Sequence, residues 1–125
     1  MASMEVLLAS PIEWSVRATG VNATVTASKA APSQGVGFRH YIFGWSFSCS
    51  AAVAATTEMR VRSSSGATIL DAVQLIAGNI PPQIINYGTH PLEGDDNADV
   101  DLNVPALGAG VICVAVLKGT TRCRG

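Results

Sequence analysis

Apolar and polar residues alternate in several short runs along this chain, which is the pattern of half-buried β-strands. The clearest run is Ala98–Val104, where every second residue is apolar and the residues between are Asp or Asn. A Gly-rich link leads from it to Val111–Lys118, which is almost continuously apolar. Such a run predicts a strand that is buried on both faces or in an oligomer interface.

The segment His40–Ser50 predicts the strand with the largest contribution to the core. Its aromatic residues recur at every second position, so we expect one face of large side chains and one of small side chains. The expected large face consists of Tyr41, Phe43, Trp45, Phe47 and Cys49. The small opposite face predicts close approach by another layer or subunit.

Shorter strands are predicted elsewhere by the same alternation. They are Glu13–Ala18, Ala23–Ala27, Glu58–Arg62, Ala67–Leu75 and a short edge strand at Gln83–Tyr87. Ser63–Gly66 predicts a hairpin turn, whereas Lys29–Gly37, Ser50–Thr57 and His90–Gly94 are expected as loops or turns.

Many short strands without helical periods indicate an all-β, single-domain antiparallel β-sandwich, jelly-roll-like and with about eight strands. We expect the domain to span residues 1–125, with an N-terminal arm (1–11) and a short C-terminal tail (118–125).

Composition favours a protein that works in contact with other proteins. Of the 125 residues 48% are hydrophobic and only 14% charged, so much of the surface must be built from small uncharged residues. The formal net charge of −1 gives no electrostatic attraction to nucleic acid or anionic membranes. No run is long enough to span a membrane, and the N-terminus is a poor secretory signal. Cys49, Cys113 and Cys123 are expected to be reduced, which fits synthesis in a cytoplasm.

Candidate chemistry is sparse. The carboxylates of Asp95–Asp101 could bind calcium, but the spacing of a calcium loop is missing and a solvated polar face is the preferred interpretation. His40 and His90 lie outside any zinc-ligand spacing, so structural or surface roles are preferred. Nucleophile and phosphate-binding motifs are also missing. The sequence therefore predicts no enzyme, no catalytic or metal residues and no cofactor.

Aromatic side chains could instead form a sugar-binding platform. The candidates are Trp14, Tyr41, Trp45 and Tyr87. Tyr41 and Trp45 are assigned to the core face of the aromatic strand, which leaves Tyr87 as the ring expected to be exposed.

Four stretches, taken in order, resemble a known family. They are Thr24–Ser28, Arg39–Gly44, His90–Gly94, and Ala98–Leu117 with Leu107–Gly110 inside it. Together they are similar to the small β-sandwich head decoration, or cement, proteins of tailed bacteriophages, over roughly residues 20 to 120. No catalytic motif comes with that family.

The resemblance implies a virion protein on the capsid surface, which binds the major capsid protein and stabilises contacts between its subunits. It also implies a homo-oligomer, a dimer or a trimer. Two alternatives stay open: a receptor- or glycan-binding module of a head or tail fibre, and a scaffold stabilised by calcium at Asp95–Asp101.

Overall fold

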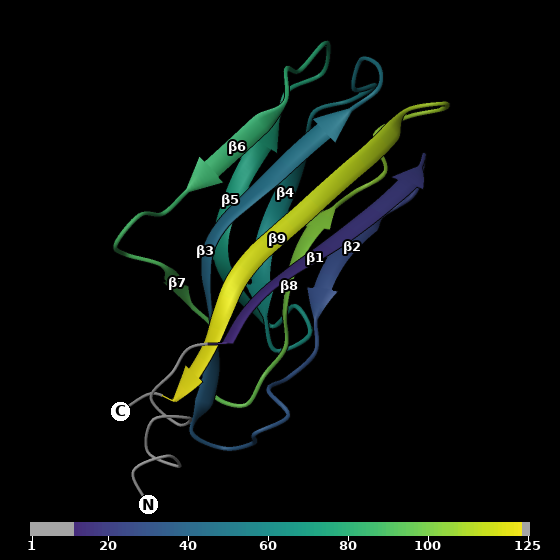
Figure 1. Ribbon diagram of the computed structural model, residues 1–125. Coiled ribbons are helices and arrows are strands. Elements are labelled where there is room, and N and C mark those ends of the chain that lie inside the picture. Colours follow the sequence, from purple (N-terminus) through teal and green to yellow (C-terminus); the bar gives the residue numbers. More distant parts are fainter. Residues whose placement is uncertain (1–11, 124–125) are drawn as a thin grey trace, which may run out of the picture.

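The computed structural model describes residues 12–123, which form two antiparallel β-sheets packed face to face (Figure 1). The strands are β1 (Ile12–Val21), β2 (Val25–Lys29), β3 (Phe38–Cys49), β4 (Thr57–Ser63), β5 (Thr68–Leu75), β6 (Gln83–Asn86), β7 (Leu92–Glu93), β8 (Val100–Val104) and β9 (Ile112–Cys123). The described residues contain no helix, and so none that is long and apolar enough to cross a membrane.

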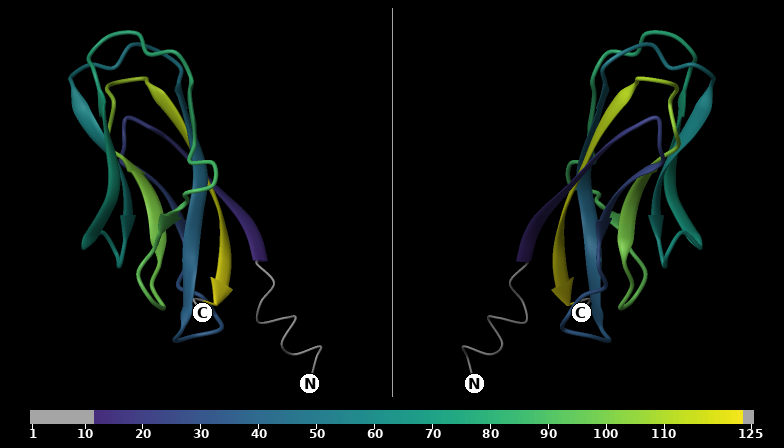
Figure 2. Two further views of the ribbon diagram at one scale, coloured as in Figure 1. Left: turned by 90° about the vertical axis from the view of Figure 1, so that its left-hand side faces the viewer. Right: turned by 90° about the vertical axis from the view of Figure 1, so that its right-hand side faces the viewer.

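The strand order is that of a jelly roll. One sheet, here sheet A, has the order β1-β9-β3-β6 with the short β7 beside β3, and sheet B has the order β2-β8-β4-β5. The pairs β1/β9, β2/β8, β3/β6 and β4/β5 are therefore nested, as in a long hairpin rolled up into two layers. Figure 2 shows these two layers edge-on. The predicted β-sandwich and its jelly-roll character are confirmed.

The core fills the space between the sheets with alternate residues of nearly every strand. Ile42 and Phe47 from β3 meet Met59 from β4 and Leu102 from β8, and all four side chains are at most 2% exposed. Burial of this kind contributes roughly 1.5–3 kcal/mol for each large apolar side chain. The alternation predicted for the strand before Val104 is confirmed, although β8 begins at Val100 rather than Ala98.

The predicted face of β3 is wrong in its first half. The register of β3 against β9 shifts between Ile42 and Gly44, so Phe43 is an extra residue in a β-bulge. The bulge changes the alternation: His40 and Ile42 point inward before it, and Trp45 and Phe47 after it. Period 2 alone cannot reveal a bulge, because the sequence on each side still alternates.

The predicted C-terminal tail is also wrong, because residues 118–123 continue β9 and pair with both β1 and β3. The N-terminal arm expected at residues 1–11 lies outside the described residues. β9 is half-buried rather than buried on both faces: Cys113, Ala115 and Leu117 point inward and the residues between them outward. The homo-oligomer stays a prediction.

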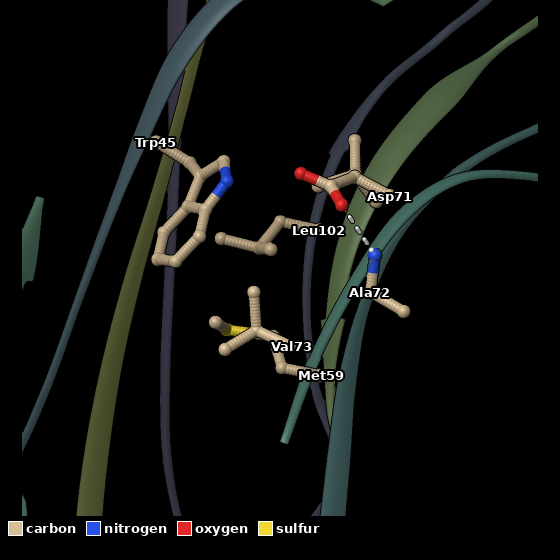
Figure 3. A pocket seen from close by; sticks show the side chains of 7 residues that line it. Trp45, Met59, Asp71, Ala72, Val73 and Leu102 are labelled. Atoms are coloured by element: carbon tan, nitrogen blue, oxygen red, sulfur yellow. Dashed lines mark hydrogen bonds between the residues drawn. The ribbon is translucent and has the colours of Figure 1, made fainter. Parts of the chain in front are cut away.

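Polar side chains close one open edge of the sandwich. The Trp45 indole N–H donates to the Tyr87 hydroxyl (2.9 Å), and that hydroxyl donates to the Asp71 carboxylate (2.6 Å). Trp45 belongs to sheet A and Asp71 to sheet B, so Tyr87 bridges the two layers. Beneath this bridge, Trp45 faces Leu102 across a crevice with no room for a water molecule (Figure 3).

Replacing Tyr87 by Phe should lower the free energy of unfolding by about 2 kcal/mol, because the Trp45 N–H and the Asp71 carboxylate would both lose their shared partner. Urea denaturation of both proteins measures the difference. Asp71→Asn keeps an acceptor for the hydroxyl and should cost less. A Tyr87→Phe protein as stable as the wild type would mean that water replaces the hydroxyl.

Candidate functional site: an uncharged loop end

Four loops meet at one end of the sandwich, opposite the start of β1 and the end of β9 (Figures 1 and 2). They are residues 22–24, 50–56, 76–82 and 105–111, and we call them together the uncharged end. None of these loops contains Asp, Glu, Lys, Arg or His. Uncharged groups lose less hydration energy than ions when a partner covers them, and the cores of protein interfaces are depleted of charge.

Backbone hydrogen bonds tie these loops to one another. Val53 and Gly78 form a two-way bridge, with N···O distances of 2.8 and 2.9 Å, between loops 50–56 and 76–82. The Ala54 N–H donates to the Leu107 carbonyl (2.8 Å), and the Asn22 N–H to the Val111 carbonyl (3.2 Å). All four loops therefore belong to one connected hydrogen-bonded unit.

Buried side chains anchor the same loops from below, while small side chains cover them. Val53, Leu107 and Val111 insert into the core. Alanine and proline side chains lie exposed above them: Ala51, Ala52, Ala54, Ala55, Ala106, Ala109, Pro81 and Pro82. Ile76, Val21 and Ile112 are exposed at the rim. Polar but uncharged side chains are exposed beside them: Asn22, Thr24, Ser50, Thr56 and Asn79. The uncharged end is thus a preorganised surface of small, uncharged groups.

The acidic run lies at the opposite end, where its carboxylates bind neighbouring loops of the protein itself. Asp95 accepts hydrogen bonds from the Ser64 and Thr68 hydroxyls (2.5 and 2.7 Å), and these bonds lower the pKa of its carboxyl. Asp99 accepts from the Ser65 N–H (2.8 Å). The run therefore joins the β4–β5 turn to the segment before β8.

Further carboxylates of this run have partners of their own. Asp96 accepts from the Gly37 N–H (2.9 Å), and Asp101 forms a bidentate pair with Arg62 (2.8 and 3.1 Å). Within residues 12–123 no group of three or more His, Cys, Asp or Glu side chains is placed to hold a metal ion. The calcium alternative gains no support from this arrangement.

His40 is a structural residue in the same polar region. Its ring is buried, with Nδ1 2.6 Å from the Thr121 hydroxyl and Nε2 2.6 Å from the Ala30 carbonyl. A neutral ring satisfies both contacts by donating from Nε2 and accepting at Nδ1. Burial lowers the pKa of His40 below its ordinary value of 6.5. His90, by contrast, is exposed.

The pKa shift of His40 predicts that acid weakens the fold. The unfolded chain takes up a proton near pH 6.5 and the folded chain only at lower pH, so the unfolded state binds more protons between these values. The free energy of unfolding should therefore fall as the pH drops from about 6.5 toward the folded pKa. Urea titrations from pH 7.5 to 4.5 measure this slope. It should be reduced in His40→Gln and kept in His90→Gln; an equal slope in all three proteins would contradict the assignment.

The aromatic residues considered for sugar binding are all engaged elsewhere. Tyr87, expected to be exposed, is half-buried in its bridge, and this prediction is wrong. Trp45 is buried, and the ring of Tyr41 is covered by the Arg122 guanidinium at 4.1 Å. Trp14 packs edge-on against His40, with ring centroids 5.3 Å apart. Tyr41, Trp45 and Tyr87 therefore offer no open platform, whereas the half-buried Trp14 lines a surface hollow with Phe43 and Lys118.

The uncharged end was missed from the sequence, although a signal was present. The four longest stretches without Asp, Glu, Lys or Arg are residues 18–28, 40–57, 72–92 and 102–117. Each contains one of the four loops of the uncharged end. The low overall charge alone does not show where an uncharged surface lies. The positions of the long charge-free stretches in the sequence do, because each stretch contains one loop of the uncharged end.

No protein-family model matches the chain, and no curated protein is similar to it in sequence. Among solved structures, it is similar to a CBM4 structure, with a TM-score of 0.44 and 9% identity over 88% of this chain and 84% of that chain. A carbohydrate-binding module CBM36 in complex with calcium and xylotriose gives a TM-score of 0.37 and 6% identity over 85% and 78%.

A full particle of Israeli acute paralysis virus gives a TM-score of 0.35 and 10% identity over 94% of this chain and 74% of that chain. Similarities of this size carry no argument on function. The β-sandwich assignment rests on the strand pairing described above.

Proposed function

We propose that this protein is a virion structural protein, a cement protein that binds the outside of a bacteriophage head and stabilises contacts between major capsid subunits. The observation that carries the proposal is the uncharged end, which would be the surface seated on the capsid. The likeness of its sequence stretches to phage decoration proteins supports the same class of function.

The rigidity of the uncharged end suits such a role. A loop that is already ordered pays little conformational entropy when it binds, so more of the contact energy is available for affinity. The bridge between Val53 and Gly78 and the bond from Ala54 to Leu107 hold the loops before any partner arrives. Small side chains such as Ala51 and Ala106 allow a partner backbone to approach closely.

Binding to an assembled shell stabilises that shell by mass action. A protein that binds only where subunits meet adds its binding free energy to the assembled state and nothing to the separate subunits. Many copies on one head raise the resistance of the whole particle, even if each contact is modest.

A glycan-binding module is the alternative, and the side chains favour it less. Sugar sites commonly use an exposed aromatic face together with polar groups. Here Tyr41, Trp45 and Tyr87 have their rings or polar atoms engaged within the protein. A capsid surface requires no such ring.

Ile76→Glu and Ile69→Glu make a matched test of the proposed surface. Ile76 lies in loop 76–82 and is 58% exposed, whereas Ile69 lies on β5 near the opposite end and is 51% exposed. Glutamate at position 76 would have to lose its hydration on binding, so we expect affinity for heads at least about 10-fold weaker. Ile69→Glu should bind like the wild type.

The measurement is co-sedimentation with empty heads of its own virus that lack this protein. Saturable wild-type binding at a fixed ratio to the capsid protein, with a raised disruption temperature of the heads, is the expected result. Absence of wild-type binding would overturn the cement role, and a glycan array would then test the alternative. Equal binding by both variants would remove the uncharged end from the interface. Thermal melts of both variants control for folding.

A further inference from the structure

Two of the three cysteines face each other across the central strands of sheet A. Cys49 on β3 and Cys113 on β9 are direct partners in the antiparallel register. Side chains of directly opposed residues lie on the same face of a sheet. Both pack against the core, Cys113 being 2% exposed and Cys49 half-buried.

The hydrogen bond of the neighbouring pair, Ser50 and Ile112, shows whether Cys49 and Cys113 form a hydrogen-bonded or a non-hydrogen-bonded pair. The Ser50 N–H donates to the Ile112 carbonyl (2.9 Å), so Ser50 and Ile112 occupy a hydrogen-bonded position of the ladder. Positions alternate along antiparallel strands, and the pair Cys49/Cys113 is therefore a non-hydrogen-bonded pair. The Cα atoms of such pairs are about 4.5 Å apart, within the range that a disulfide spans.

We propose that Cys49 and Cys113 form an oxidation site, at which a small-molecule disulfide converts the two thiols into a cross-strand disulfide that fastens β3 to β9. The thiols are free in the structure described here. This inference is independent of capsid binding, because it concerns the protein's own covalent state.

The reaction is thiol–disulfide exchange in two steps. The half-buried Cys49, as the thiolate, attacks one sulfur of the reagent, forms a mixed disulfide and releases the first small-molecule thiolate. Cys113 then loses its proton, attacks the Cys49 sulfur and releases the second thiolate. The two released thiolates take up the two protons, so the reagent is reduced to two thiols and the protein loses two hydrogens.

Cys49 is suited to react first because it is the more exposed of the two cysteines. Burial raises the pKa of Cys113 to about 11, which makes this thiol slow toward reagents in solution. Once Cys49 carries the mixed disulfide, its sulfur stands directly opposite Cys113. Proximity then favours closure of the disulfide over attack by a second reagent molecule.

The position of the bond gives it a structural consequence. β3 leads into loop 50–56 and β9 follows loop 105–111, so the disulfide would join the roots of two loops of the uncharged end. It would also close a loop from residue 49 to residue 113. A disulfide that closes a long loop removes more conformational entropy from the unfolded state than one that closes a short loop.

The test uses the full chain with Cys123→Ser, which removes the exposed third thiol and leaves one possible intramolecular pair. Folded protein is incubated with oxidised glutathione and then examined by intact mass, peptide mapping and thermal melting. We expect a mass loss of about 2 Da, a cross-linked 49–113 peptide, and a melting temperature about 10 °C higher than for the reduced protein. The double variant Cys49→Ser, Cys123→Ser should show neither change.

Three results would overturn the proposal. The first is a stable glutathione adduct on Cys49 with Cys113 still reduced, and the second is no reaction at either thiol. The third is a closed disulfide whose melting temperature is no higher than that of the reduced protein, because the bond would then not fasten the strands.

Discussion

Replacing Gly119 by alanine should destabilise the protein by about 3 kcal/mol, because β9 has no space for a side chain at this position. A β-carbon there would lie 2.5 Å from the Tyr41 carbonyl oxygen and 2.5 Å from a ring carbon of Trp14. The carbonyl belongs to the backbone of β3, so it cannot move away as the end of a flexible side chain could. Trp14 stands directly opposite Gly119 on β1 and covers it with its indole ring.

Gly20→Ala is the matched control, since Gly20 also lies in a strand of sheet A. Its added β-carbon would meet a methyl group of Val25 at 3.0 Å, a contact that a small side-chain shift relieves. We expect a change of less than about 1 kcal/mol. Chemical denaturation of the three proteins gives the comparison. A Gly119→Ala protein as stable as Gly20→Ala would show that β3 and β9 can separate at little cost.

Removing Arg62 should destabilise the protein by a similar amount. Its guanidinium binds both oxygens of Asp101, a residue that is only 5% exposed. Arg62→Met would leave a buried carboxylate without its cation, at a cost of about 3 kcal/mol. Arg62→Lys keeps the charge but loses the bidentate hydrogen bonds to Asp101. Its stability should therefore lie between those of the wild type and Arg62→Met.

The double variant Arg62→Met, Asp101→Leu separates the cost of the orphaned charge from the contribution of the pair. Replacing a buried ion pair by apolar side chains is often close to neutral. We therefore expect the double variant to recover most of the stability lost in Arg62→Met, as measured by urea unfolding. A double variant as unstable as the single one would mean that Arg62 acts through packing rather than through Asp101.

Alternation along the strands was sufficient to predict the class of fold. Val100 and Leu102 were expected inside and are fully buried. The hairpin turn predicted at Ser63–Gly66 lies one residue further on, at residues 64–67. The bulge at Phe43 was not predictable, because one inserted residue leaves the pattern on both sides unchanged. β7 at Leu92–Glu93 was missed for a different reason: two residues are too few to show a period.

The candidate surface depends on tertiary structure more than on any motif. Ala54, Gly78 and Leu107 are far apart in the sequence, and only the rolled-up strand order brings their loops together. Conversely, the acidic run around Asp95 was conspicuous in the sequence but is occupied in joining loops. The charge-free stretches of the sequence contain the loops of this surface, but the sequence analysis did not use them.

The place of β9 in sheet A has a consequence for the synthesis of the protein. β9 is the last strand within residues 12–123, yet it lies between β1 and β3 and pairs with both over most of its length. A nascent chain that has not yet released this strand from the ribosome leaves β1 and the long edge of β3 without their partner. Sheet A can therefore be completed only after β9 has been synthesised, and we expect slow folding during which two strand edges are open to aggregation.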